Sequence, residues 1–189
     1  MASDTRLTTH TLPDLLAPGL RLVSVGLNPS LPSVAAGFYF ANPRNRFWAA
    51  LNASELVREH LTPGPEAMRR LFEVHRIGFT DLVKRPTRGA GELRAADYRA
   101  GAAALEARLA RYAPRLLWFH GRVAWGHFLH HARRLQPAAD WGLQPERLAG
   151  APVFVTPNPS PANAAFSRAD LTAHYRALAH YLAALEGTR

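Results

Sequence analysis

The stretch VSVGLNPSLPSVAAGFYFANPRNRFW, residues 23–48, decides the fold. Its first residues belong to a short apolar run, LRLVSVG at 20–26. Such a run is typical of a strand buried on both faces. Asn28-Pro29 follows directly, and the aromatic residues FYF stand at 38–40 in a segment with no charge before Arg44. The pattern predicts a polar turn at the tip of a buried strand, with aromatic rings beside it.

Short apolar runs and amphipathic segments alternate along the rest of the chain. Strands are expected at 20–26, 77–83, 115–120 and 151–157, and helices at 45–59, 65–75, 95–112, 121–133 and 167–186. Ser167 and Asp170 give the last helix a capping-box-like start. The alternation predicts an α/β protein with a parallel sheet covered on both faces.

The chain is expected to be one domain, because no break in composition divides residues 1–189. Residues 1–15 are expected to be a flexible N-terminal extension. The Pro- and Gly-containing segment 133–150 is expected to be a surface excursion.

Composition sets the broad class of the protein. There is no cysteine, so disulfides, cysteine nucleophiles and thiolate metal sites are excluded, and a cytoplasmic protein without a signal peptide or membrane span is expected. The 23 cations exceed the 14 acidic residues, which gives a net charge of +9, and every cation except Lys84 is an arginine. Such a charge favours nucleic acid or another anionic surface as the partner, although a general bias toward arginine would give the same count.

Several common motifs are missing. The sequence has no GxGxxG after a strand, no GxxxxGK[ST] and no GxSxG, which excludes the usual dinucleotide, P-loop and nucleophile-elbow sites. His127, His130 and His131 have helical spacing without an HExxH motif, so they are interpreted as a helix face and no metal site is predicted.

Four polar clusters directly follow the expected strands. Ligands of parallel sheets bind beyond the carboxyl ends of the strands, so these clusters should meet at one edge. The clusters are GLNP from Gly26, TD from Thr80, HGR from His120 and PNPS from Pro157.

Two of these clusters resemble a known family. GLNPSLPSVAAGFYFANPRNRFW is similar to the first motif of the mismatch-specific uracil/thymine-DNA glycosylases, within the uracil-DNA glycosylase superfamily, and NPSPANAAFS is similar to the second. The resemblance runs from about Leu16 to about Leu182. It implies a three-layer α/β/α sandwich with a central four-stranded, mainly parallel sheet. It also implies a monomeric enzyme without metal or cofactor that flips uracil out of DNA and hydrolyses its bond to the sugar.

The resemblance implies a role for each motif residue. Asn28 would position the attacking water, and Phe40 would stack on the flipped base, with Leu27 and Phe38 beside it. Asn158 would donate to the uracil O2; an equally good interpretation is that it caps the following turn. The expected DNA contacts are Ser33, Arg122, Ser160, Pro161, Ala162 and Asn163.

Two departures from the family pattern stand out. Ala162 occupies the place of a bulky wedge, so looser mismatch selectivity is expected, with single-stranded DNA as a further substrate beside duplexes containing uracil or a mismatched pyrimidine. Asp81 follows GFT where relatives commonly carry Lys or Asn. A carboxylate can accept a proton from water, which the Asn28 amide cannot, so Asp81 is predicted to be catalytic. The alternative is that it pairs with Lys84 or Arg85, or caps a turn.

Three functions remain open at this point. The first is a glycosylase that removes uracil, especially from G·U mismatches, without a Schiff-base step. The second is a protein that flips and senses a damaged base without cutting. The third is a hydrolase of free nucleosides, whose activity would depend little on salt.

Overall fold

The computed structural model describes residues 10–187, and its centre is a five-stranded sheet with the order β2-β1-β3-β5-β4. The strands are β1 (Leu22–Gly26), β2 (Ile77–Asp81), β3 (Leu117–His120), β4 (Gly142–Leu148) and β5 (Ala151–Thr156). The first four strands in this order are parallel, and β4 runs antiparallel to β5 at the edge.

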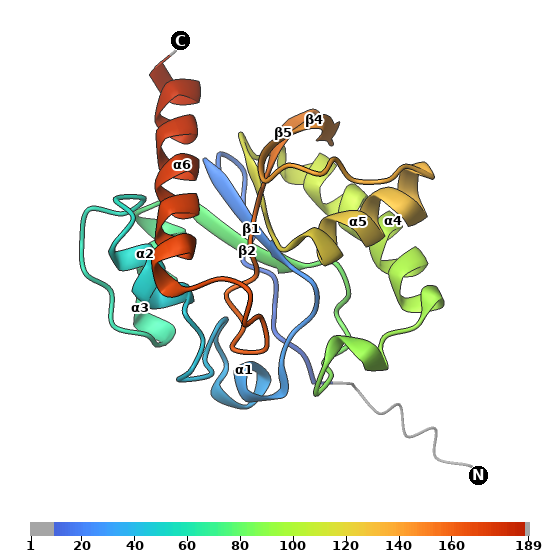
Figure 1. The fold of residues 1–189 in the computed structure, drawn as a ribbon, viewed down its shortest axis with the longest axis horizontal. Helices are drawn as coiled ribbons and strands as arrows, with labels where there is room; N and C mark the ends of the chain where they lie inside the picture. Colours follow the sequence, from blue (N-terminus) through green and yellow to red (C-terminus); the bar gives the residue numbers. More distant parts are fainter. Residues whose placement is uncertain (1–9, 188–189) are drawn as a thin grey trace.

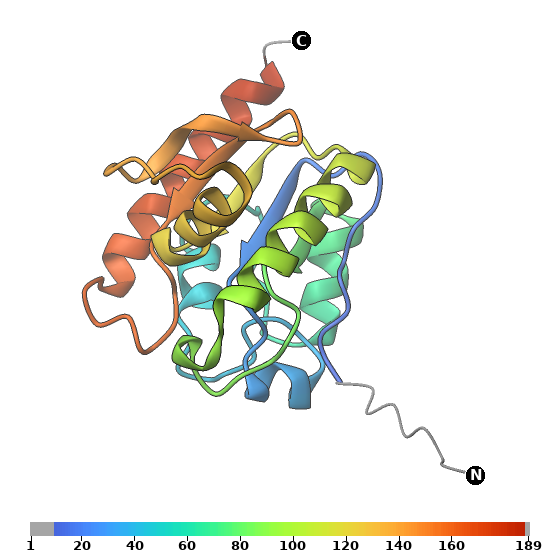
Figure 2. The same ribbon diagram turned by 90° about the vertical axis from the view of Figure 1, so that its right-hand side faces the viewer.

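Helices cover both faces of the sheet. They are α1 (Leu31–Ala36), α2 (Phe47–Asn52), α3 (Pro65–Glu73), α4 (Ala95–Tyr112), α5 (Arg122–Arg133) and α6 (Arg168–Gly187), with a short 3₁₀ helix, η1, at Ala90–Glu92. In Figure 1, α2, α3 and α6 lie on one side of the strands and α4 and α5 on the other. Figure 2 shows the second side in front, which confirms three layers.

Alternate residues of the buried strands point to opposite faces of the sheet, so each strand contributes to the hydrophobic core on either face. Along β1, Leu22 packs toward α2, α3 and α6, whereas Val23 and Val25 pack toward α4 and α5. Every residue of β2 and β5 is buried, as expected of strands covered on both faces. The Ser167 and Asp170 side chains form the expected reciprocal bonds at the start of α6.

The prediction of four strands was wrong by one. The fifth strand, β4, lies in the segment that was expected to be a surface excursion. That expectation arose because Gly142 and Pro145 do not fit a regular strand. β4 tolerates them at the edge of the sheet, where its register with β5 shifts between Leu143 and Arg147.

The N-terminal segment is also more ordered than expected. Leu12 is 2% exposed, and Leu15 forms an antiparallel bridge to Phe79 with N···O distances of 2.9 and 3.0 Å. A flexible extension therefore does not reach residue 15, and the rest of that prediction, residues 1–9, lies outside the described residues. Among the helices of residues 10–187, none is long and apolar enough to cross a membrane.

Candidate active site

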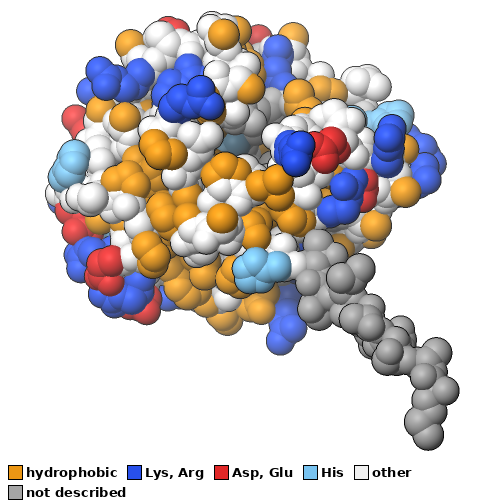
Figure 3. All heavy atoms as spheres, turned by 90° about the horizontal axis from the view of Figure 1, so that it is seen from below, with side chains coloured by type: hydrophobic (Ala, Val, Ile, Leu, Met, Phe, Trp, Pro, Cys, Tyr) orange, Lys and Arg blue, Asp and Glu red, His pale blue; other side chains and the backbone are white. Residues whose placement is uncertain are grey.

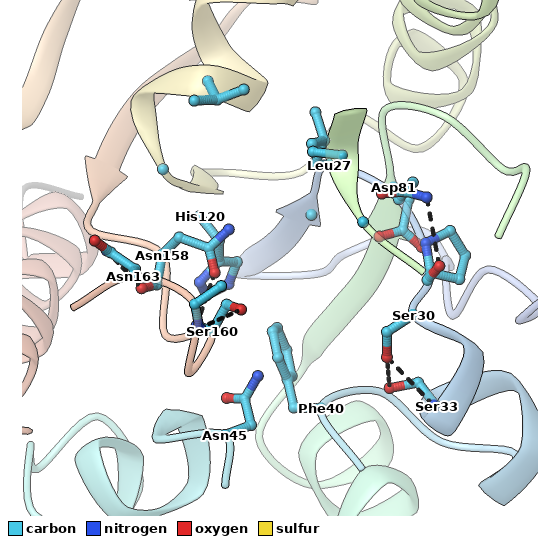
Figure 4. Close-up of a pocket in the computed structure, with 18 of the residues that line it drawn as sticks. Leu27, Ser30, Ser33, Phe40, Asn45, Asp81, His120, Asn158, Ser160 and Asn163 are labelled. Atoms are coloured by element: carbon cyan, nitrogen blue, oxygen red, sulfur yellow. Dashed lines mark hydrogen bonds between the residues drawn. The ribbon is translucent and has the colours of Figure 1, made fainter. Parts of the chain in front are cut away.

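A cavity of about 560 Å³ opens at the carboxyl edge of the parallel strands. Its walls come from the segments that follow β1, β2, β3 and β5, as the position of the four polar clusters predicts. In Figure 4, Asp81 and Ser33 lie on one side of this space, and Asn158 and Ser160 lie on the other. The structure therefore brings the residues of both motifs into one site.

Asn28 is held rigidly by its amide nitrogen. Its Nδ2 donates to the carbonyl of Arg85 at 2.9 Å, to Thr87 Oγ1 at 2.8 Å and to the carbonyl of Pro29 at 3.4 Å. Within residues 10–187, no hydrogen bond is made to its Oδ1, so this oxygen can accept a bond from a water molecule. The arrangement suits a residue that orients water rather than one that removes its proton.

Asp81 lies beside this turn and is almost completely buried, with 3% of its surface exposed. It pairs in register with Gly26 of β1, and a Cβ at Gly26 would lie only 2.5 Å from Asp81 Oδ1. Glycine is therefore required at position 26 for the carboxylate to occupy this place. Burial raises the pKa of Asp81 from 3.8 to about 7, although Lys84 opposes this shift.

The alternative interpretation of Asp81, an ion pair with Lys84 or Arg85, holds only in part. Lys84 Nζ stands 3.7 Å from Asp81 Oδ2, whereas Arg85 pairs with Asp97 at 2.8 Å. Oδ2 is buried and has no hydrogen-bond partner in the part of the chain that the structure describes. Because Asp81 is both buried and part of the cavity wall, a surface ion pair does not account for it.

Phe40 forms the aromatic wall of the cavity. Its ring stacks on Phe47 with centroids 4.0 Å apart, and its backbone has a left-handed φ of 58°. Such a conformation is costly for a bulky residue and is often found at functional sites. The carbonyl of Phe40 is fixed by Trp48 Nε1 at 3.2 Å. Phe40 is therefore placed where a planar base could stack on it.

Two other predicted base contacts are placed differently. Leu27 lines the cavity, but its carbonyl already accepts a bond from the Val83 N–H at 2.9 Å. Phe38 does not reach the site: it lines a separate apolar hollow with residues of α3, including Met68 and Phe72. Of the three consecutive aromatic residues, Tyr39 and Phe40 line the cavity, whereas Phe38 lines only the hollow beside α3.

Asn158 caps the turn that follows it, as one interpretation of the sequence predicts. Its Oδ1 accepts a bond from the Ser160 N–H at 2.8 Å, which is the expected turn cap. This bond fixes the amide, and its Nδ2 has no hydrogen bond to any residue of the described range 10–187. Asn158 can thus cap the turn and still present a donor to the cavity.

Arg46 ties the two motifs together. Its guanidinium donates to the carbonyls of Ser160 and Asn163, both at 2.7 Å, and it also contacts the carbonyls of Pro159 and Phe166. Arg46 therefore joins the first motif, in which it lies, to the backbone of the second motif. These bonds hold the main chain of the second loop, and the Asn163 side chain adds a bond to the carbonyl of Asn158 at 2.9 Å.

The predicted DNA contacts divide into two groups. Ser160, Ala162 and Asn163 line the cavity, and Pro161 is exposed between them. Ser33 is only 4% exposed, and its Oγ accepts bonds from the Ala41 N–H and Ser30 Oγ, which suits a support for the loop.

Arg122 lies at the rim of the cavity, and its guanidinium is directed toward Trp141 and Ala138. Its guanidinium stands 4.8 Å from the centroid of the Trp141 ring, and Nη2 donates to the carbonyl of Ala138 at 3.4 Å. Figure 3, which views the side of α1, shows basic side chains around this face and hydrophobic ones across its centre. The described residues contain no group of three or more His, Asp or Glu that could hold a metal ion.

His120 also lines the cavity, although the resemblance to the family implied no role for it. Its Nε2 is 2.8 Å from Ser24 Oγ, and its ring meets the edge of Phe40 at 5.1 Å between centroids. Burial lowers the pKa of His120 to about 3, so the imidazole is neutral. The signal was its position, directly after WF at the end of a buried strand and before Gly121.

Comparison with known proteins identifies a similar fold and the family of the chain. A solution NMR structure of a candidate uracil DNA glycosylase from Methanosarcina acetivorans superposes with a TM-score of 0.61 over 93% of this chain and 98% of that chain, at 23% identity. That likeness concerns the fold. The family model of the uracil DNA glycosylase superfamily matches residues 13–185. The chain therefore belongs to the uracil DNA glycosylase superfamily.

Proposed function

We propose that this protein is a DNA glycosylase that removes uracil from DNA, including G·U mismatches, and leaves an abasic site. The observation that carries the proposal is a buried carboxylate with a pKa of about 7, Asp81, in the same cavity wall as a rigid amide, Asn28. A general base whose pKa lies near the working pH combines the right protonation state with useful basicity.

The proposed reaction is a hydrolysis at the anomeric carbon. A water molecule held by Asn28 Oδ1 forms the new C–O bond, and Asp81 accepts its proton. The bond between C1′ and N1 of uracil breaks, and its electrons leave with the base as an anion. Asn158 Nδ2 is a donor that can stabilise this developing charge, and Phe40 holds the flipped ring.

The proposal includes a single chemical step without a covalent intermediate. Lys84 is the only lysine in the chain, and it lies outside the cavity wall with its ammonium bonded to Asp14 at 2.8 Å. An amine engaged in this way is a poor nucleophile. We therefore expect no Schiff base with the abasic site and no strand cleavage.

The proposed substrate range is broad. The loop that faces the DNA ends in the small, exposed Ala162, so it offers little to fill the gap in a duplex. Removal of uracil should therefore depend only weakly on the opposite base, and single-stranded DNA should also be cut.

Single-turnover uracil release tests this proposal. The substrates are G·U and A·U duplexes, single-stranded DNA with uracil, and free deoxyuridine, each with a chelator present. We expect release from all three DNAs, none from deoxyuridine, and no adduct after borohydride. Tight binding of uracil-containing DNA without release would instead support base sensing, and cleavage of deoxyuridine alone would support a nucleoside hydrolase.

A further inference from the structure

A second cluster of charges lies behind Asp81, outside the cavity wall. It contains Asp14, Lys84 and Arg108, which come from the N-terminal segment, the loop after β2, and α4. Asp14 contacts both cations: Lys84 Nζ is 2.8 Å from its Oδ1, and Arg108 Nε is 3.2 Å from its Oδ2. None of these residues has a role in the reaction described so far.

The position of Asp14 is fixed by the chain around it. The bridge between Leu15 and Phe79 places the N-terminal segment alongside β2. Thr80 Oγ1 then donates to Asp14 Oδ1 at 2.7 Å. Because Lys84 Nζ lies near both carboxylates, Asp14 is part of the electrostatic surroundings of Asp81.

Lys84 is shared unequally between the two carboxylates. Its Nζ makes a hydrogen bond of 2.8 Å to Asp14, but it stays 3.7 Å from Asp81 Oδ2 and 3.5 Å from the hydroxyl of Tyr39. Asp81 Oδ2 is therefore left without a hydrogen bond from any described residue, although a lysine stands beside it. A direct bond from the ammonium would stabilise the ionised carboxylate and make it a weaker base.

The charges that face Asp81 act in opposite directions on its pKa. Burial raises this pKa most, Lys84 and Arg108 lower it, and Asp14 raises it. Arg108 reaches Asp81 through the main chain, where Nη2 donates to the carbonyl at 2.9 Å. Tyr39 stays neutral, because burial raises its pKa far above the ordinary value, and its hydroxyl donates to the carbonyl of Pro13.

We propose that Asp14 is a positioning residue for uracil removal, which holds Lys84 away from Asp81 and so keeps Asp81 basic enough to accept a proton from water. This inference rests on the proposed function and adds the part of the protein that tunes it. It assigns the N-terminal segment to the active site, although Asp14 does not touch the substrate. Lys84 has a matching role as the charge that Asp14 restrains.

The pH dependence of single-turnover uracil release tests the proposal through two variants with opposite signs. In Asp14→Asn, Lys84 turns to Asp81, so the midpoint of the acid limb should move down by about one pH unit and the alkaline plateau should fall. In Lys84→Met, the cation is lost, so the midpoint should move up by a similar amount. Asp140→Asn, which removes the charge of an exposed aspartate, is the matched control and should leave the midpoint in place.

A direct titration separates this inference from the proposed function. The ¹³C signal of the Asp81 carboxyl, assigned by its loss in Asp81→Asn, gives the midpoint in the free protein without any activity. Opposite displacements in the two variants support the role of Asp14 even if wild type releases no uracil. An unchanged midpoint in Asp14→Asn, with the fold preserved by circular dichroism, overturns it even if uracil release is fast.

Discussion

Asp81 and Asn28 lie on a buried and densely bonded side of the cavity, whereas the loop 160–163 on the opposite side is exposed and built of small residues. On the first side, side chains are fixed by specific partners, such as the three acceptors of the Asn28 amide. On the second, Arg46 holds the backbone, and the side chains of Ser160 and Asn163 bond to main-chain groups of the same segment. The difference indicates that the structure fixes the candidate catalytic side chains closely, whereas it leaves the side chains at the tip of the opposite loop exposed.

A large loss of stability is expected when the tie between the two sides is removed. Arg46→Ala leaves the carbonyls of Ser160 and Asn163 without their charged donor, which should lower the free energy of unfolding by about 3 kcal/mol. Urea unfolding measures this loss. Arg46→Lys, which keeps the charge but not the planar fork, should recover only part of it. Full stability in the Ala variant would mean that the two motifs hold their shapes independently.

The aromatic wall should matter for holding the flipped base. Phe40→Ala removes the stacking surface, which is worth about 1–3 kcal/mol per base, so uracil release at low enzyme concentration should slow by roughly 5- to 150-fold. Phe38→Ala is the matched control, because its ring lies in the separate hollow by α3. Equal losses in the two variants would show that the loop, rather than the ring of Phe40, is what the reaction needs.

The buried carboxylate should have a pH-dependent cost in stability. The pKa of Asp81 is raised from 3.8 to about 7, so its stabilising contribution is complete below about pH 4 and is lost as the pH rises through 7. The Asp81→Asn variant does not lose stability in this way, because an asparagine side chain does not ionise. Its stability relative to wild type should therefore increase between pH 4 and pH 8 by about 4 kcal/mol, since each unit of pKa difference between the folded and unfolded states is worth about 1.4 kcal/mol. A difference that does not change with pH would contradict the burial of a titrating carboxyl.

The smallest effect is expected at the loop tip. Ala162→Leu adds a side chain that can enter the gap left by a flipped base, so binding to a uracil-containing duplex should improve by about 0.5–1 kcal/mol. Binding to single-stranded DNA should stay the same. Ala164→Leu, at an exposed position outside the cavity wall, is the control. A similar gain on both DNAs would indicate general apolar contact rather than a wedge.

Much of this site could be predicted from the sequence because parallel strands end at a common edge. The rule placed Asn28, Asp81 and Asn158 together, although they are far apart in the chain. The boundaries of α4, which the sequence predicted at 95–112, were also correct, because its apolar positions recur at helical spacing.

The parts that the sequence did not reveal depend on contacts between distant segments. The edge strand β4 contains a proline, which lies where the register with β5 shifts between Leu143 and Arg147. Asp14 acquires its role only through the bridge from Leu15 to Phe79, and no local pattern marks that bridge. The direction of the Phe38 side chain depends on the packing of α3 against the loop.

The central claim is that Asp81 is the base of a uracil-removing reaction, and its most direct test is single-turnover release from a G·U duplex across pH 5 to 9. In wild type, the rate should rise with pH to a plateau, with a midpoint near the Asp81 pKa of about 7. Asp81→Asn should be slower by about two or more orders of magnitude at the plateau, with no such midpoint. A variant that releases uracil as fast as wild type would contradict the claim and leave Asn28 as the main catalytic residue.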